Sequence, residues 1–382
     1  MKLLTHIAIL IASVCLLNGC DQPSAIKPSG KKIKVGIIGP FRGSQLAQGK
    51  EGLKGIKTAM HLQPYLENGD GVELVVEDDQ NEPSLTEKAL KKLTEVDKVS
   101  AILILSSSDP VLKIAPIADT HKTPTLALIA THPDVTINRS FVSQLCSDDI
   151  FQGTVAALFV MDELLIDTVA VFSNPDSSYS SNLAAQFMRK FKSLGGRITE
   201  IVSLTQETGN YTNILESIRN KKTELLYLPI RAKDIIQIVK ALKKMGWKPE
   251  MMGSDGLLST VLTQYKKESG LLEGMLATDF YAHRMPLTSY GKKAIKTFIS
   301  LFGGGGTTYT ALGAEGYALL LNAMNRCNTP GNRACINRMI RNTVDFTGIM
   351  GKISIKSNGK ALRPLVVNAI KDDHLEFVVK VY

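Results

Sequence analysis

The sequence predicts an α/β protein built as two Rossmann-like lobes, each with a parallel β-sheet covered by helices. The 382 residues are 44% hydrophobic and 21% charged, a length and composition sufficient for two separate cores. From Ile33 onward, short β-branched runs alternate with amphipathic helical patterns, which is typical of parallel sheets. Because the strands are too numerous for one ordinary sheet, we expect two lobes of about 150 residues each.

The first sheet and its helices are predicted between residues 33 and 128. The expected strands are 33–38, 72–76, 101–105 and 125–128, and the expected helices are 52–62 and one that begins at Ser84. Ser84 and Glu87 have the spacing of a capping box. Another helix is expected directly after 106–108, with Asp109 as its N-cap and Pro110 in its first position.

The second sheet is predicted from the same alternation further along the chain. The expected strands are 168–172, 198–203, 224–228 and 251–252, and the expected helices are 232–245 and 311–324. The C-terminal part turns to β structure, with strands at 352–355, 365–370 and 375–381 and a turn at 358–359. The tetraglycine 303–306 lacks the Lys-Ser/Thr of a phosphate loop, so we interpret it as a flexible connection.

The N-terminal sequence predicts an export signal. Lys2 precedes an apolar run over 3–17, which is too short for a membrane span and fits a signal peptide. The run ends in Leu-Asn-Gly-Cys at 17–20, which resembles the lipobox of bacterial lipoproteins, so we expect residues 1–19 to be removed and Cys20 to be lipidated. An ordinary secretory signal with an incidental cysteine is the alternative. Residues 20–32, rich in Pro, Ser and Lys, are interpreted as a lipidated tether.

Asp21, the residue after the lipobox, and the remaining cysteines add further expectations for an exported protein. Asp21 resembles a signal for retention at the inner membrane, if the source has two membranes. Cys327 and Cys335 bracket a turn-prone loop in an exported chain, so they form either a local disulfide or two unpaired thiols. Cys146 is interpreted as a small buried residue.

Several classes of function are disfavoured. The net charge of +9 suggests nucleic acid, but the lysines are scattered and not gathered with aromatics, so we expect no nucleic-acid partner. Neither a Gly-x-Ser-x-Gly elbow nor a His-Glu-x-x-His motif occurs, and we expect no enzyme. His132 and His283 have no partner at metal-ligand spacing, so neither a metal nor another cofactor is expected.

Polar residues follow several predicted strands at the edge where open α/β sheets bind ligands. Ser106 and Ser107 come after one strand, Ala130 and Thr131 follow the next, and Asp255 lies in a Gly-Ser-Asp-Gly segment of the second lobe. Hydroxyls on one lobe and a carboxylate on the other would suit a zwitterion. Alternatively, the serines are only helix caps and Asp255 is only a turn residue.

The chain resembles the leucine/isoleucine/valine-binding family of type I periplasmic binding proteins from Ile33 to about Pro364. The landmarks are Gly39-Pro40 with Gly43 and Gly49, Ser106–Ser108, Ala130-Thr131 before Pro133, Tyr179 before Leu183-Ala184, Gly253–Gly256 and Glu273–Met275. The resemblance implies a three-strand hinge between lobe 1, residues 33–147 and 279–350, and lobe 2, residues 148–278 and 351–382.

The resemblance also implies roles for the candidate residues. Ser106 and Thr131 would hold the carboxylate of an amino-acid ligand with nearby backbone amides, Asp255 would pair with the ammonium, and Tyr179 would line the second lobe. Tyr179 as a packing aromatic is the alternative. The implied function is capture of an amino acid or similar ligand outside the inner membrane and delivery to an ABC transporter permease. A ligand sensor or a regulator of a cell-envelope protein is the alternative function.

Two departures from the family put branched-chain specificity in doubt. Gln48 stands where an aromatic is common, and Pro229, Ile230 and Arg231 stand where Gly-Gly-Tyr is common. Arg231 could hold a second acidic group of the ligand or point to solvent.

Overall fold

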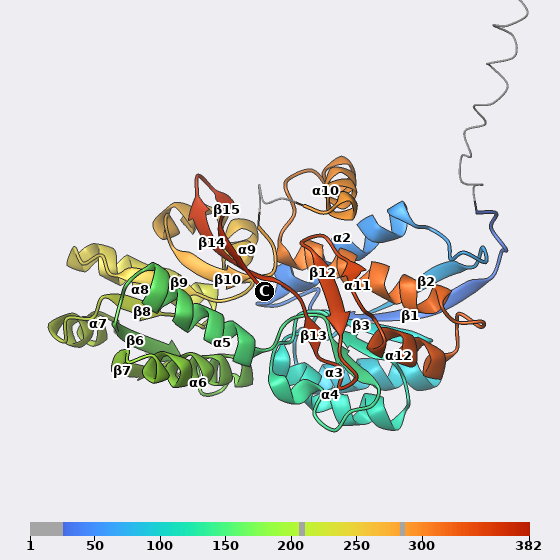
Figure 1. The fold of residues 1–382 in the computed structure, drawn as a ribbon, viewed down its shortest axis with the longest axis horizontal. Helices are drawn as coiled ribbons and strands as arrows, with labels where there is room; N and C mark the ends of the chain where they lie inside the picture. The colour runs from blue at the N-terminus through green and yellow to red at the C-terminus, as the bar shows by residue number, and fades with distance from the viewer. Residues whose placement is uncertain (1–25, 206–210, 283–286) are drawn as a thin grey trace, which may run out of the picture.

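The computed structural model describes residues 26–205, 211–282 and 287–382. Two α/β lobes lie side by side along the long axis of the molecule, the first mainly blue to cyan with orange helices and the second mainly green to yellow (Figure 1). Each lobe has its own sheet, and helices pack on the faces of both sheets. The predicted two-lobed α/β fold is therefore confirmed.

The first lobe contains a five-stranded sheet with the order β2-β1-β3-β4-β5, in which all neighbours are parallel. Its strands are β1 (Lys32–Gly39), β2 (Gly71–Asp78), β3 (Ala101–Ile104), β4 (Thr125–Ala127) and β5 (Val142–Gln144). Its helices are α2 (Leu46–Leu62), α3 (Pro83–Lys91), α4 (Ser108–Thr120), α10 (Ser289–Phe302), α11 (Thr308–Asn325) and α12 (Arg333–Arg341). Strand β3 is buried along its whole length, as expected when helices cover both faces.

The second lobe contains a seven-stranded sheet with the order β15-β14-β10-β9-β8-β6-β7. Its strands are β6 (Thr168–Ser173), β7 (Arg197–Ser203), β8 (Leu225–Tyr227), β9 (Glu250–Gly253), β10 (Leu276–Asp279), β14 (Leu365–Lys371) and β15 (His374–Val381). Its helices are α5 (Asp149–Leu158), α6 (Ser178–Ser193), α7 (Tyr211–Asn220), α8 (Ala232–Met245) and α9 (Leu257–Gln264). Strands β14 and β15 are antiparallel to their neighbours and close one edge.

A small sheet corrects the predicted limit of the first lobe. Strand β12 (Lys352–Ile355) pairs with β11 (Phe346–Thr347) and with β13 (Ala361–Leu362). In the turn between β12 and β13, the carbonyl of Gly359 accepts a hydrogen bond from Gln144 N in the first sheet. These bonds hold the hairpin beside the first lobe, so the last passage to the second lobe falls at Arg363 and Pro364 and not at residue 351.

Two predicted helix starts are wrong. Helix α3 begins at Pro83 and its N-cap, Glu82, makes no side-chain capping bond, so the capping box from Ser84 to Glu87 does not form. Helix α4 begins at Ser108 instead of after Asp109. The Asp109 carboxylate instead accepts hydrogen bonds from the backbone and hydroxyl of Ser178 in the second lobe.

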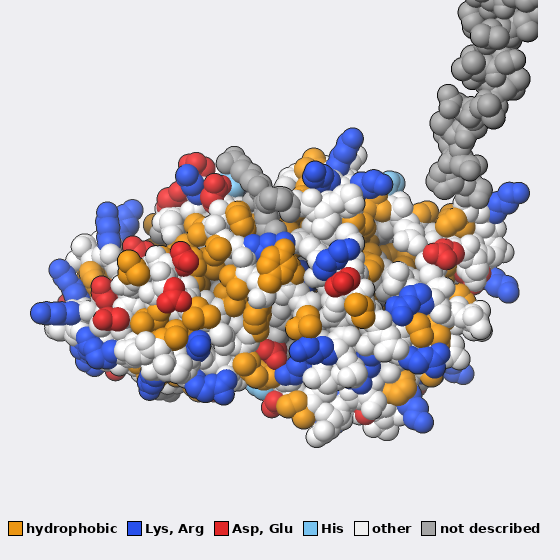
Figure 2. Space-filling model, viewed as in Figure 1, with side chains coloured by type: hydrophobic (Ala, Val, Ile, Leu, Met, Phe, Trp, Pro, Cys, Tyr) orange, Lys and Arg blue, Asp and Glu red, His pale blue; other side chains and the backbone are white. Residues whose placement is uncertain are grey.

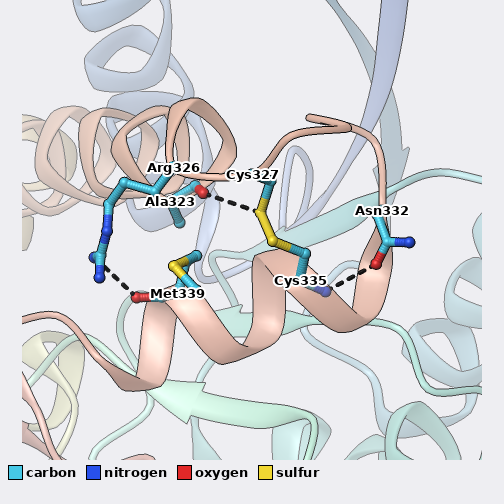
Figure 3. The surroundings of a disulfide bond; sticks show 6 residues. All are labelled: Ala323, Arg326, Cys327, Asn332, Cys335 and Met339. Atoms are coloured by element: carbon cyan, nitrogen blue, oxygen red, sulfur yellow. Dashed lines mark hydrogen bonds between the residues drawn. A yellow bond between two sulfur atoms is a disulfide. The ribbon is translucent and has the colours of Figure 1, made fainter.

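Two cysteines of the first lobe, Cys327 and Cys335, are paired. Cys327 and Cys335 form a disulfide that joins the end of α11 to the first turn of α12 (Figure 3). Asn332 caps α12 by accepting a hydrogen bond from Cys335 N at 2.9 Å. Cys146 is buried, and its Sγ donates to the carbonyl of Leu128 at 3.0 Å.

One buried ion pair lies where the chain passes between the lobes. Arg363 and Glu315 are both fully buried, and Nη2 lies 2.8 Å from Oε2. The guanidinium also reaches the carbonyls of Leu145 and Phe280, each at 3.5 Å, which belong to the two earlier passages. Glu315 Oε1 accepts from Ile349 N. Arg363 therefore contacts all three connecting segments.

The surface charge, the helix lengths and the possible metal ligands bear on the remaining predictions. Lys and Arg side chains are spread over both lobes on the face shown in Figure 2. None of the helices within the described ranges is long and apolar enough to cross a membrane. Within the same ranges no cluster of His, Cys, Asp and Glu is arranged to hold a metal. Cys20 and residues 1–19 lie outside the described residues, as does His283.

Candidate ligand-binding cleft

A cleft of about 1000 Å³ lies between the two lobes. Ser107 and Asn81 line it from the first lobe, and Tyr179, Arg231 and Asp255 line it from the second. These residues follow strands or begin helices, so backbone N–H groups at the starts of α4, α6 and α8 are close to the cleft. The structure thus brings four of the seven predicted ligand residues, Ser107, Tyr179, Arg231 and Asp255, to one cavity.

Ser107 and Asn81 form the polar surface of the first-lobe wall. The side-chain oxygen of Asn81 accepts a hydrogen bond from Ser107 N at 2.8 Å, and the Asn81 amide lies 2.7 Å from the Ser107 hydroxyl. Asn81 was not among the predicted ligand residues. It lies three residues after the end of β2, so applying the strand-end rule to that strand as well would have found it.

Ser106 lies behind this wall. It is fully buried and donates a hydrogen bond to the carboxylate of Asp79. Asp79 also accepts from the Thr86 hydroxyl at 2.8 Å, and burial raises its pKa in spite of these hydrogen bonds. The Ser106 hydroxyl is therefore used inside the first lobe and does not line the cleft in this structure.

Ala130 and Thr131 are also buried behind the cleft surface. The carbonyl of Ala130 accepts from Gln144 Nε2 at 3.0 Å, and the carbonyl of Thr131 accepts from Asp149 N at 3.0 Å. Ile129, just before them, does line the cleft. The backbone of this segment thus links the first sheet to the start of α5.

Tyr179 and Asp255 are in direct contact on the second-lobe wall. The Tyr179 hydroxyl lies 2.6 Å from Asp255 Oδ1 and 2.7 Å from the Ser254 hydroxyl. Burial raises the pKa of Asp255, and burial together with the nearby Asp255 carboxylate raises that of Tyr179. Tyr179 therefore keeps its proton and can donate it to a hydrogen bond with Asp255.

Further carboxyl groups are buried beneath Asp255. Gln152 Oε1 accepts from the Thr278 hydroxyl at 2.8 Å and from Asp255 N at 3.4 Å. Burial raises the pKa of Asp149 to about 7 and that of Asp279 to about 7. Within the described ranges no Lys, Arg or His forms an ion pair with Asp149, Asp255 or Asp279. Among the described residues, the base of the cleft is consequently an acidic region without a cation of its own.

Arg231 and Gln48 occupy the positions where the chain departs from the family. Arg231 is the N-cap residue of α8, its side chain is 52% exposed, and Nε lies 3.4 Å from Asp234 Oδ2. Gln48 lines the cleft, but its amide donates to the carbonyl of Leu105 at 2.7 Å and is buried. Arg231 therefore reaches the cleft as an exposed cation, whereas Gln48 mainly ties α2 to the first sheet.

A polar cleft between two α/β lobes defines a two-lobed binding protein. Residues 32–374 match the profile of the family described as periplasmic binding protein, and the chain belongs to that family. The resemblance inferred from the sequence is confirmed.

Individual relatives are distant in sequence but close in fold. An amino acid binding protein of Pseudomonas aeruginosa is 23% identical over 250 residues, which cover 64% of this chain and 66% of the relative, just under two thirds. A leucine binding protein of Thermotoga maritima has a TM-score of 0.85 at 29% identity, covering 91% of this chain and 98% of that one. A solute binding protein of Rhodopseudomonas palustris in complex with 3,4-dihydroxybenzoic acid has a TM-score of 0.80 at 18% identity, covering 92% and 97%.

Proposed function

We propose that this chain is the solute-binding component of an ABC transporter and that it captures an amino acid in the cleft between its lobes. The observation that carries the proposal is Asp255, a partly buried carboxyl on the cleft wall with no cationic partner among the described residues. An ammonium group of a ligand would supply the missing charge, and the two charges would attract each other more strongly at this partly buried position than in water.

The ligand carboxylate is assigned to the opposite wall. Ser107 lies at the cleft surface as the N-cap of α4, where the helix leaves backbone N–H groups unpaired. Ser106, Ala130 and Thr131, implied by the family resemblance, lie one layer behind. In the proposed pose Ser107 and the α4 amides contact the carboxylate first, and Thr131 and Ser106 contribute if the closed form exposes them.

The remainder of the cleft favours a polar ligand side chain. Asn81, Gln237 and Thr260 line it, and Arg231 adds a half-exposed cation. An acidic group on the ligand would compete with Asp234 for the Arg231 guanidinium, whose planar shape fits a carboxylate. We therefore propose that the ligand carries a polar or acidic side chain, unlike a branched-chain amino acid.

The family and the N-terminal sequence support the proposed location. Periplasmic binding proteins act outside the cytoplasm, and the lipidation proposed at Cys20 would hold the chain at the outer face of the inner membrane through the tether 20–32. The partner is then the ABC transporter permease, which would recognise the closed form. Uptake by proteoliposomes containing that permease would separate delivery from the sensor alternative.

The test is thermal unfolding of the soluble form that begins at Asp21, with a panel of neutral, basic and acidic amino acids. A ligand at about 100 times its dissociation constant should stabilise the fold by about 2.7 kcal/mol. The shift should vanish in Asp255→Asn and persist in the control Asp162→Asn, which changes an exposed carboxylate outside the cleft. Absence of a shift with every amino acid would contradict the proposal.

A further inference from the structure

A second cavity lies at the hinge, separate from the cleft, with a volume of about 620 Å³. From the first lobe it is lined by the β12–β13 hairpin, and from the second by the first turns of α5 and by Tyr382. Ser147, Asp148, Arg363 and Pro364, where the chain passes between the lobes, complete it. None of its lining residues lines the cleft between the lobes.

The lining has an apolar part and a basic part. Ile150, Phe151, Leu362 and Pro364 form the apolar part, and Ile150 and Leu362 are 37% and 52% exposed. The basic side chains are Lys352, Lys356 and Lys360. Figure 2 shows hydrophobic and basic side chains close together in the region where Figure 1 places β12 and β13.

Only part of this positive charge is neutralised by the protein. Lys360 Nζ forms an ion pair with Asp148 Oδ2 at 2.8 Å, which joins the hairpin to the start of α5. Lys352 Nζ donates to the Thr347 hydroxyl at 2.7 Å, and Lys356 has no ion-pair partner among the described residues. With Asp345 the other acid in the lining, the cavity has more cations than anions. Its charge and its apolar wall together match an anion with an apolar body.

The first turn of α5 separates this cavity from the base of the cleft. Ile150, Phe151 and Thr154 face the hinge cavity. Gln152, between them in sequence, is fully buried and accepts hydrogen bonds from Asp255 N and the Thr278 hydroxyl. A molecule that fills the hinge cavity would therefore press on the same helical turn that positions Asp255.

We propose that the hinge cavity binds an amphipathic carboxylate, with the apolar body against Phe151 and Leu362 and the carboxylate near Lys356 and Lys352. Because the cavity has walls from both lobes, the bound molecule fixes the distance between the hairpin and α5 and so alters closure of the cleft. Binding of this carboxylate at the hinge cavity does not depend on the proposed function. Its effect on closure of the cleft rests on the proposed function.

The experiment is isothermal titration of the soluble form with octanoate as the probe and 1-octanol as its uncharged counterpart. Octanoate should bind with one-to-one stoichiometry, and octanol at least about tenfold more weakly. Leu362→Asp and Lys356→Glu, both at exposed positions, should each weaken octanoate binding about tenfold or more. The matched controls Leu165→Asp and Lys371→Glu lie outside the cavity and should leave it unchanged.

The outcomes distinguish this proposal from the proposed function. Octanoate affinity that is unchanged in Leu362→Asp, or equal to that of octanol, would overturn the hinge site. Loss of octanoate binding in Asp255→Asn but not in Leu362→Asp would place octanoate in the cleft and also overturn it. If an amino acid binds the cleft, saturating octanoate should change its dissociation constant at least about threefold, and the reciprocal change should appear for octanoate. An unchanged constant would overturn the coupling.

Discussion

The hinge and the base of the cleft both contain buried ionisable groups, but among the described residues only those at the hinge form an ion pair. At the hinge, Arg363 and Glu315 are fully buried against each other, and backbone groups satisfy other atoms of both. At the cleft, Asp149, Asp255 and Asp279 have raised pKa values and no cation among the described residues. Burying an unpaired charge is costly, so a protein keeps such acids mainly where a ligand or a reaction uses them. The paired group is structural, and the unpaired group is where we propose that a ligand cation binds.

The largest effect is expected at the hinge. Arg363→Met leaves the Glu315 carboxylate buried without its partner and should lower the free energy of unfolding by about 3 to 5 kcal/mol, measured by urea denaturation. The double variant Arg363→Met with Glu315→Gln keeps an acceptor for Ile349 N and should recover more than half of the loss. A loss of less than about 1 kcal/mol in the single variant would remove the distinction between hinge and cleft.

At the cleft we expect a substitution to weaken ligand binding without lowering the stability of the fold. Asp255→Asn should weaken amino-acid binding about 100-fold, equivalent to about 2.7 kcal/mol, because the ammonium loses its counter-charge. The free energy of unfolding without ligand should stay the same or rise, since a partly buried carboxyl with a raised pKa has been removed. Titration calorimetry and urea denaturation on the same samples give both values. Destabilisation as large as that of Arg363→Met would show that Asp255 is structural.

A smaller effect should appear in the pH dependence of stability. The folded chain holds protons on Asp149 and Asp279 up to about pH 7, whereas the unfolded chain releases them near pH 4. Stability contributed by these groups is therefore complete below about pH 4 and is lost as the pH rises to about 7. Asp149→Asn with Asp279→Asn should show a weaker decline over this range in thermal unfolding without ligand. Identical pH profiles would contradict the raised pKa values.

The smallest effect is expected at Thr131. Its hydroxyl is buried and does not line the cleft, so Thr131→Val should change the free energy of unfolding by less than about 1 kcal/mol. If the closed form brings the hydroxyl to the ligand carboxylate, the amino-acid affinity should nevertheless fall about fivefold to tenfold. Unchanged affinity would leave Ser107 and the α4 amides as the carboxylate contacts from the first lobe.

Most strands of the two large sheets were predicted from the sequence because each is a short β-branched run bounded by a helical pattern. The short strands β5 and β10 were not predicted. Helix α8 was predicted with its observed limits, as its apolar residues repeat on one face and Gly246 ends it. The start of α4 was not, because Asp109 makes its hydrogen bonds to Ser178 in the other lobe. No local pattern reveals such a partner.

The candidate site was predictable to a similar extent. Asp255 was found because it follows a strand in a glycine-flanked turn, and Ser107 because it precedes a helix. The strand-end rule also selected Ser106, Ala130 and Thr131, which the structure buries one layer behind the cleft surface. The ion pair of Arg363 with Glu315 joins residues that are distant in sequence, so it emerged only from the three-dimensional structure.

The buried thiol of Cys146 makes the soluble form suitable for labelling at a single introduced cysteine. In the form that begins at Asp21 it is the free cysteine of the described chain, and burial raises the pKa of its thiol well above the ordinary value. Thiol-directed dyes should therefore not react with Cys146 while the protein is folded. A cysteine introduced at the exposed rim, for example Asp176→Cys, would carry a single fluorophore next to the cleft. Lobe movement could then be followed optically without first removing any native cysteine.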